Sequence, residues 1–455
     1  MTNDMTKGSP IKLILSFMVP LLIGNIFQQF YNMADTIIVG RTISVEALAA
    51  VGATGSISFL IVGFVQGVTS GFAVITAQRF GAGSENGVRR SVATSIILGI
   101  AVTIVMTAIS VLAARPLLEI MKTPSDIIDD SYNYIIVIFE GIAAAVFFNL
   151  FSSILRSLGD SKTPLVFLII ASIINIILDP IMIFGYFGLP AMGAAGAAIA
   201  TVIGQCIAAL LAIYYNLKKN PDIQLSFKSF RPEGDVIGRI LSIAVPSIAM
   251  VAVGSVMTYG FNRILFTFTP IAVSVFGIFY KVQSMAFMPV FGLNNGMIPI
   301  VSYNYGAKQP DRMLKAVKYT MMAAICFMLL CLTAMQVIPD LILKVFDAQE
   351  DMMAIGIPAL RTMSISFLFA GICIVCSGMF QALGKGVYSL IVSLARQLIV
   401  LLPVAYAFAK FTRNLELVWL SFPIAEVVSV ILSIAMALQT KKKIIDPLKN
   451  SVKTV

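Results

Sequence analysis

Long apolar runs recur along nearly the whole chain and constrain its fold more than any other feature. Each is long enough to cross a bilayer, because a spanning helix needs about 20 mostly apolar residues. Lipid offers no partner to backbone polar groups, so such segments must be helical. The expected spans are 12–39, 47–77, 91–114, 131–153, 162–184, 190–216, 238–264, 272–302, 314–338, 353–380, 386–409 and 415–438. Several exceed the thickness of a bilayer, which predicts tilted or bent helices.

The composition favours a membrane protein over a soluble one. Only 12% of the 455 residues are charged and 58% are hydrophobic, whereas soluble domains carry about a quarter charged residues. The sequence contains no His, so the commonest general base and metal ligand is missing. It also lacks the usual hydrolase and phosphate-binding motifs. We therefore expect an all-α membrane protein that is not an enzyme and needs no cofactor.

The positions of Lys and Arg predict the orientation. With the N-terminus inside, the cytoplasmic segments hold 22 of the 32 basic residues and the external loops hold eight; Lys281 and Arg396 fall within spans. Basic residues concentrate on the cytoplasmic side of membrane proteins. Both termini are thus expected on the cytoplasmic side of the cytoplasmic membrane. The net charge of +10 reflects this topology, and no nucleic-acid partner is expected.

The chain contains an internal repeat. Three pairs of segments recur at an offset of about 225 residues: FMVPLLIG at 17–24 with IAVPSIAM at 243–250, QRFGAG at 78–83 with YNYGAK at 303–308, and LRSLGDSK at 155–162 with FQALGKGV at 380–387. Six spans per half make the repeat parallel, with a pseudo-two-fold axis along the membrane normal. This layout is typical of alternating-access transporters. It predicts a six-helix lobe at 1–216, a cytoplasmic linker at 217–237, and a second six-helix lobe with a basic cytoplasmic tail at 238–455.

Acidic residues inside the spans indicate an ion site. Asp35 and Asp179 lie late in the first and fifth spans, where a carboxylate costs at least about 2.5 kcal/mol. Asn175 precedes Asp179 by one helical turn, and Pro180 leaves a backbone carbonyl without its donor. Such oxygen ligands suit a proton or Na⁺. The alternative is that each acid simply pairs with a buried Lys or Arg.

Three further residues within the spans have an open interpretation. Pro20 lies in the middle of the first span, where a proline produces either a static kink or a place for the helix to bend. Glu140 and Glu426 also fall within spans, and the sequence assigns neither of them a role.

Several segments resemble the multidrug and toxic compound extrusion (MATE) family over essentially the whole chain. They are VPLLIGNIFQQFYNMADTIIVGR at 19–41, QRFGAG at 78–83, NIILDPIMIFG at 175–185, and FGIFYKVQSMAFMPVFGLNNGMIPIVSYNYGA at 276–307. The resemblance implies an antiporter coupled to H⁺ or Na⁺ that exports small amphipathic, cationic compounds such as drugs. We expect it to act as a monomer among membrane lipids. A flippase for lipids or lipid-linked oligosaccharides would share this architecture and is the alternative.

The resemblance also implies which residues form the ion site. In prokaryotic members the first lobe holds a cation, and the matching residues here are Asp35, Asn175, Asp179 and Thr201, the set that would bind Na⁺, together with Tyr134 on the fourth span. Pro20 matches a proline at which the first helix bends, and Pro180 would bend the fifth. One branch of the family carries further acids on its seventh and tenth helices. These spans have none here, which favours ion coupling through the first lobe.

Overall fold

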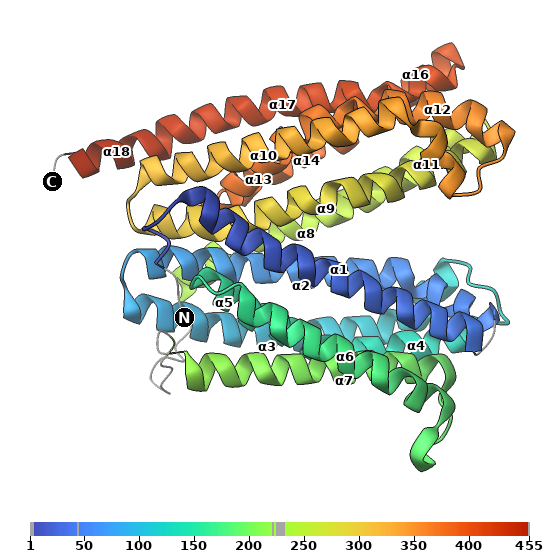
Figure 1. Ribbon diagram of the computed structural model, residues 1–455, viewed down its shortest axis with the longest axis horizontal. Coiled ribbons are helices and arrows are strands. Elements are labelled where there is room, and N and C mark those ends of the chain that lie inside the picture. Colours follow the sequence, from blue (N-terminus) through green and yellow to red (C-terminus); the bar gives the residue numbers. More distant parts are fainter. Residues whose placement is uncertain (1–3, 43–44, 221–222, 224–232, 454–455) are drawn as a thin grey trace. The chain divides into compact units, whose positions relative to one another are not determined.

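The computed structural model describes the chain except residues 1–3, 43–44, 221–222, 224–232 and 454–455, and for residues 31–37, 39–42, 45–48, 56 and 451–453 it describes the backbone alone. All regular structure in the described part is helical (Figure 1). Ten helices are long and apolar enough to cross a membrane there, and two bent helix pairs bring the number of spans to twelve. The predicted all-α fold with twelve spans is therefore confirmed.

The helices of the first half are α1 (Pro10–Thr42), α2 (Val45–Gly81), α3 (Glu85–Ile120), α4 (Ile128–Glu140), α5 (Ile142–Ser157), α6 (Lys162–Phe184), η1 (Tyr186–Gly188), α7 (Gly193–Tyr214) and η2 (Tyr215–Lys219). Those of the second half are α8 (Gly234–Phe266), α9 (Pro270–Gly306), α10 (Pro310–Val337), α11 (Pro339–Val345), α12 (Glu350–Ser364), α13 (Ser366–Ala382), α14 (Gly386–Leu394), η4 (Ala395–Leu401), α15 (Leu402–Ala407), η5 (Phe408–Thr412), α16 (Leu415–Trp419), α17 (Ser421–Thr440), η6 (Lys441–Ile445) and α18 (Asp446–Lys453).

Both bent spans occupy the same place in the repeat. The fourth span consists of α4 and α5, which meet at Gly141 with a bend of 42°, and the tenth consists of α12 and α13, which meet at Ile365 with a bend of 43°. At the first break the bare backbone of Gly141 packs against Val202 of α7. A Cβ on residue 141 would lie only 2.4 Å from a Val202 methyl group, so the packing leaves no room for a side chain there. Bends of this size need a local cause such as glycine or a packing neighbour, and the repeat preserves their position.

The turns between helices show the repeat in backbone detail. In the turn after α2, the amides of residues 82, 83 and 84 donate to the carbonyls of residues 78, 80 and 79. In the turn after α9, the amides of residues 307, 308 and 309 donate to those of 303, 305 and 304. Every donor and acceptor is thus 225 residues from its counterpart. Gly83 and Lys308 hold the equivalent left-handed position, with φ of 67° and 54°.

Two compact units can be distinguished, and two helices contribute to both. One unit contains residues 1–4 and 19–244, and the other contains residues 5–18 and 245–455. The boundary within α1 falls just before Pro20, and the boundary within α8 falls just before Pro246. Each proline is the fourth residue of its segment in the first repeated pair, so both helices change unit at the same place in the repeat.

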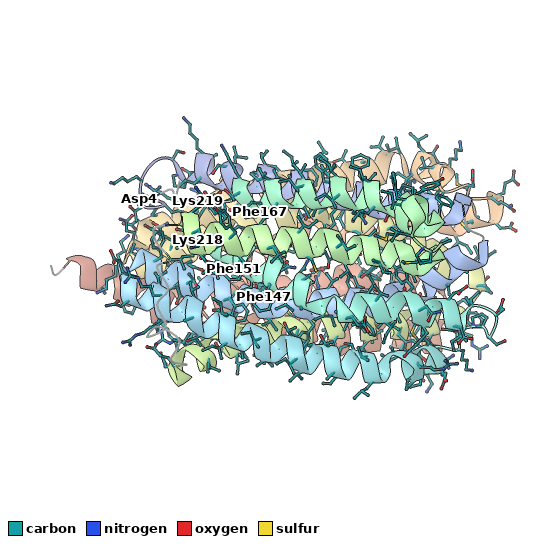
Figure 2. All side chains as sticks on the ribbon, turned by 90° about the horizontal axis from the view of Figure 1, so that it is seen from below. Asp4, Phe147, Phe151, Phe167, Lys218 and Lys219 are labelled. Atoms are coloured by element: carbon teal, nitrogen blue, oxygen red, sulfur yellow. The ribbon has the colours of Figure 1, made fainter. Side chains whose placement is uncertain are left out.

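In the first unit, α2 to α7 lie alongside one another (Figure 1). Phe147 and Phe151 of α5 stack with ring centroids 6.4 Å apart, and Phe167 of α6 meets the ring of Tyr215 edge-on (Figure 2). Lys218 and Lys219 follow at the end of η2 (Figure 2). Aromatic pairs of this geometry stabilise a fold beyond the area they bury.

Glu233 ties the end of the linker to this same unit. Its carboxylate accepts hydrogen bonds from Arg79 at the end of α2, at 3.2 Å, and from Arg90 near the start of α3, at 2.8 Å. Burial acts to raise the pKa of Glu233, but the hydrogen bonds and positive charges of Arg90 and Arg79 outweigh it and lower the pKa below its usual value. The residue just before α8, Glu233, is therefore held by two ion pairs.

The second unit is built around an aromatic cluster. Phe261 of α8 contacts Phe276 of α9 and, from α16 and α17, Trp419 and Phe422, with ring centroids 4.8 to 6.0 Å apart. Trp419 is the only tryptophan in the sequence and is 1% exposed. This cluster holds the N-terminal end of α17 against α8 and α9.

Candidate functional site

The candidate site lies on α6, where Asn175 and Asp179 occupy one face a single turn apart. Both are buried, with Asn175 3% and Asp179 0% exposed. A buried carboxylate in a membrane span marks a functional site by default, because its desolvation is costly. The predicted spacing of these two residues thus brings their side chains together.

The amide of Asn175 connects the two helices that form the site. Its Nδ2 atom donates to Oδ1 of Asp179 at 3.3 Å and to Oγ1 of Thr201, on α7, at 3.2 Å. Thr201 is half-buried. Three residues that the family resemblance assigned to one site therefore form one hydrogen-bonded chain.

A close approach of α7 to α6 makes this contact geometrically feasible. A Cβ on Gly204, one turn after Thr201, would lie 2.9 Å from the carbonyl oxygen of Ala171 and 3.5 Å from Cβ of Asn175. Only glycine allows two helix backbones to approach so closely. A cavity of about 30 Å³ lies beside the hydrogen-bonded chain, lined by Leu168, Ala171, Ser172, Asn175, Thr201, Gly204 and Gln205. This volume admits a single small ion or water molecule.

The oxygens of the site suit a small cation. Oδ1 of Asn175 is buried and accepts no hydrogen bond from the described residues, although a buried acceptor normally has a donor. Pro180 lies within α6, has no N–H and therefore cannot donate to the carbonyl of Ile176. A carboxylate, an amide oxygen, a hydroxyl and a freed carbonyl are hard ligands for Na⁺, and the carboxylate alone can take up a proton. Among the described residues there is no group of three His, Cys, Asp or Glu that could hold a metal.

Tyr134 of α4 lies close to this site. It packs against the apolar cluster of Ile183, Ala194 and Ala197, in which Ile183 follows Asp179 by one turn and Ala197 precedes Thr201 by one turn. Ile38 of α1 belongs to the same apolar cluster. Asp35 lies within α1, one turn before Ile38, and its side chain falls outside the described residues.

Both prolines of the prediction lie inside continuous helices. Pro20 is an interior residue of α1 and Pro180 an interior residue of α6. At Pro20 the helix passes from one compact unit to the other, as does α8 at Pro246. Sequence reasoning singled out Pro20 but not Pro246, although the repeat aligns the two.

The two unassigned acids have different surroundings. Glu140 ends α4 at the break before Gly141 and is exposed. Glu426 of α17 is 6% exposed, and its Oε1 accepts a hydrogen bond of 2.8 Å from Nη1 of Arg396 in η4. Arg396, one of the two cations that the sequence places inside spans, therefore has its acidic partner in the second unit. Sequence reasoning listed both residues and did not pair them.

Comparisons with known proteins agree on one family. The MatE family model matches residues 20–181 and again 246–407, once in each half. The "Probable multidrug resistance protein YoeA" of Bacillus subtilis is 27% identical over 445 residues, which is 95% of this chain and 94% of the relative. A structure described as "Crystal structure of MATE in the bent conformation" is 25% identical, with a TM-score of 0.91 and 99% of each chain covered. A second, described as "Outward-facing conformation of a multidrug resistance MATE family transporter of the MOP superfamily", is 25% identical, with a TM-score of 0.87, and covers 99% of this chain and 100% of the other.

Proposed function

Because this chain belongs to the MatE family, and is thus a multi-pass membrane transporter of the multidrug efflux type and not an enzyme, we propose that it is a cation-coupled antiporter. In this proposal H⁺ or Na⁺ moves inward while small amphipathic, cationic compounds move outward. The observation that carries it is the hydrogen-bonded chain of Asp179, Asn175 and Thr201, which lies beside a cavity of ion size.

Asn175 suits a site that must work in two charge states. When Asp179 is ionised, the amide N–H of Asn175 donates to it, which stabilises the charge. When a proton or Na⁺ arrives, the amide oxygen, which has no donor among the described residues, supplies a ligand or accepts a hydrogen bond. Uptake and release of the ion then change the hydrogen bonds between α6 and α7.

Antiport requires that ion and drug favour opposite states of the transporter or compete for one of them. Pro20 and Pro246 are suited to bending, since a proline weakens the helix one turn earlier, and each stands where its helix changes unit. We infer that ion uptake at Asp179, together with Asp35 on α1, favours one conformation of α1 around Pro20. Drug release accompanies that conformation.

The same proposal includes the location. The excess of basic residues in the loops that would face the cytoplasm supports cytoplasmic termini. The proposal places the chain in a bacterial or archaeal cytoplasmic membrane, where it acts as a monomer among lipids. Relatives and structural neighbours named for multidrug resistance do not favour a flippase.

The test is transport by purified protein in liposomes with an imposed pH or Na⁺ gradient and ethidium as the substrate. Asp179→Asn keeps the size and the hydrogen-bonding capacity of the side chain but cannot carry the charge. We expect it to abolish gradient-driven accumulation while the protein remains folded. Asp130→Asn, at an exposed carboxylate in the first turn of α4, is the matched control and should transport like the wild type. Wild-type rates in Asp179→Asn under both gradients would exclude a coupling role for this residue.

A further inference from the structure

The ion pair of Arg396 and Glu426 lies near the middle of the membrane part of the second unit. Arg396 follows the start of α14 by ten residues, and Glu426 follows the start of α16 by eleven. At 1.5 Å per residue, each lies about 15 Å into a hydrocarbon layer that is about 30 Å thick. Charged side chains at this depth face the protein interior or a water-filled space, because lipid would make them costly.

The pair also lies on the two spans that correspond to those carrying the candidate cation site. At the 225-residue offset of the repeated turns, Glu426 corresponds to Thr201 and Arg396 corresponds to Ala171. The fifth and sixth spans carry the cation site of the first unit, and the eleventh and twelfth carry this pair. The second unit therefore has a guanidinium in the helix pair where the first unit has its carboxylate.

One edge of the guanidinium remains available to a ligand. Glu426 engages only Nη1 of Arg396, while Nε and Nη2 make no hydrogen bond within the described part of the chain and are not among its buried unsatisfied atoms. The Arg396 side chain is 26% exposed and that of Glu426 is 8% exposed. The Nε–Nη2 edge has the spacing that binds a carboxylate through two parallel hydrogen bonds.

The charges of this unit favour an anionic ligand. Glu426 neutralises Arg396 in part and is itself buried, so it offers a ligand little negative charge. Lys281, about a third of the way along α9, is exposed and has no acidic partner among the described residues. The spans of the second unit thus carry positive charge in the helix pair that corresponds to the one carrying Asp179 in the first unit.

We propose that Arg396, held in position by Glu426, binds the carboxylate of amphipathic substrates. This inference rests on the proposed export function and adds a substrate class to it. The class consists of compounds that carry an anionic group beside an apolar or cationic moiety. Glu426 acts as a positioning residue, since it orients the guanidinium and lowers its net attraction for anions.

The experiment compares binding of two dyes to purified full-length protein in lipid nanodiscs, with fluorescence anisotropy as the readout. Tetramethylrhodamine carries a free carboxylate, and its methyl ester has the same rings without that charge. Empty nanodiscs correct for partition into lipid. We expect the wild type to bind the free acid more tightly than the ester.

Two substitutions should change the affinity for the acid in opposite directions. Arg396→Gln removes the charged donor and should weaken binding of the free acid about tenfold or more, while ester binding stays within about twofold. Glu426→Gln leaves Arg396 with its full charge and should strengthen binding of the free acid. The double variant Arg396→Gln/Glu426→Gln removes both charges without leaving one buried and unpaired, and should also lose the preference for the acid.

A purely structural ion pair would give a different result, with all three variants changing the affinities for acid and ester alike. That result, or a wild type with no preference for the free acid, would overturn the proposal. Because the assay needs no gradient, Asp179→Asn should keep the wild-type ratio of the two affinities. Failure of ion coupling is therefore distinguishable from failure of carboxylate binding.

Discussion

Gly204→Ala tests whether the close approach of α7 to α6 sets the geometry of the cation site. The added Cβ would lie 2.9 Å from the carbonyl oxygen of Ala171, whereas ordinary contact begins at 3.4 Å. The helices must therefore separate locally by about 0.5 Å, which is the difference between these distances. Added to the 3.2 Å between Asn175 Nδ2 and Thr201 Oγ1, this shift takes the contact to about 3.7 Å, beyond hydrogen-bond range.

The cost has two parts. Overpacking of a tight contact destabilises a protein by about 1–3 kcal/mol, and a lost hydrogen bond between membrane helices adds about 0.6 kcal/mol. We expect a lower melting temperature for Gly204→Ala. We also expect a coupling-ion affinity that is weaker by about threefold to tenfold, because the Thr201 hydroxyl moves away from its partner.

Thermal unfolding in detergent and ion-dependent transport in liposomes would measure these two effects. Gly55→Ala is the matched control, since a Cβ on Gly55 of α2 would meet nothing within 4 Å. It should leave transport unchanged and should not lower stability, because alanine favours a helix over glycine. If Gly204→Ala matched Gly55→Ala in both measurements, the helix approach would not determine the geometry of the site.

Four further substitutions address the linker, a turn and the two prolines. Glu233→Gln should lower the melting temperature near neutral pH. The difference in melting temperature from the wild type should vanish as the pH falls through the lowered pKa of Glu233, because protonation breaks the same ion pairs in the wild type. A difference that persists in acid would contradict this reasoning. Lys308→Gly should raise stability by about 0.5–1 kcal/mol, because Lys308 holds a left-handed φ of 54°, and no gain in melting temperature would contradict it. Pro20→Ala and Pro246→Ala should each slow transport in liposomes while substrate binding in nanodiscs persists, and unchanged rates in both would exclude bending there.

The fold was largely predictable because lipid limits the backbone structures that a spanning segment can adopt. Apolar length predicted the twelve spans, and the repeated segments predicted how the halves correspond. The breaks at Gly141 and Ile365 were not predictable in the same way. At Gly141 the neighbour is Val202 of another helix, and a sequence pattern within one helix carries no information about the side chain that packs against it.

The candidate site was predictable to the extent that it lies on one helix. Asn175 and Asp179 meet because residues four apart share a helix face. Thr201 was assigned from the family resemblance, and its contact with Asn175 depends on how α7 is rotated and on the bare backbone of Gly204. The pairing of Arg396 with Glu426 was missed for the same reason. It joins two helices, and the periodicity of residues along each helix does not say how the helices are rotated relative to each other.

The repeat explains why ion coupling would belong to the first lobe alone. Both lobes use the same pair of spans for buried polar groups, but the second places a guanidinium there and carries apolar residues, Val400 and Val404, at the positions equivalent to Asn175 and Asp179. A cation that approached Glu426 would be repelled by Arg396, which is 2.8 Å from the same carboxylate. We therefore expect one ion-binding site per chain, measurable as the binding stoichiometry of Na⁺ or H⁺, and loss of all ion binding in Asp179→Asn. Ion binding retained by that variant and lost only after a further change at Glu426 would mean that the second lobe also takes up ions.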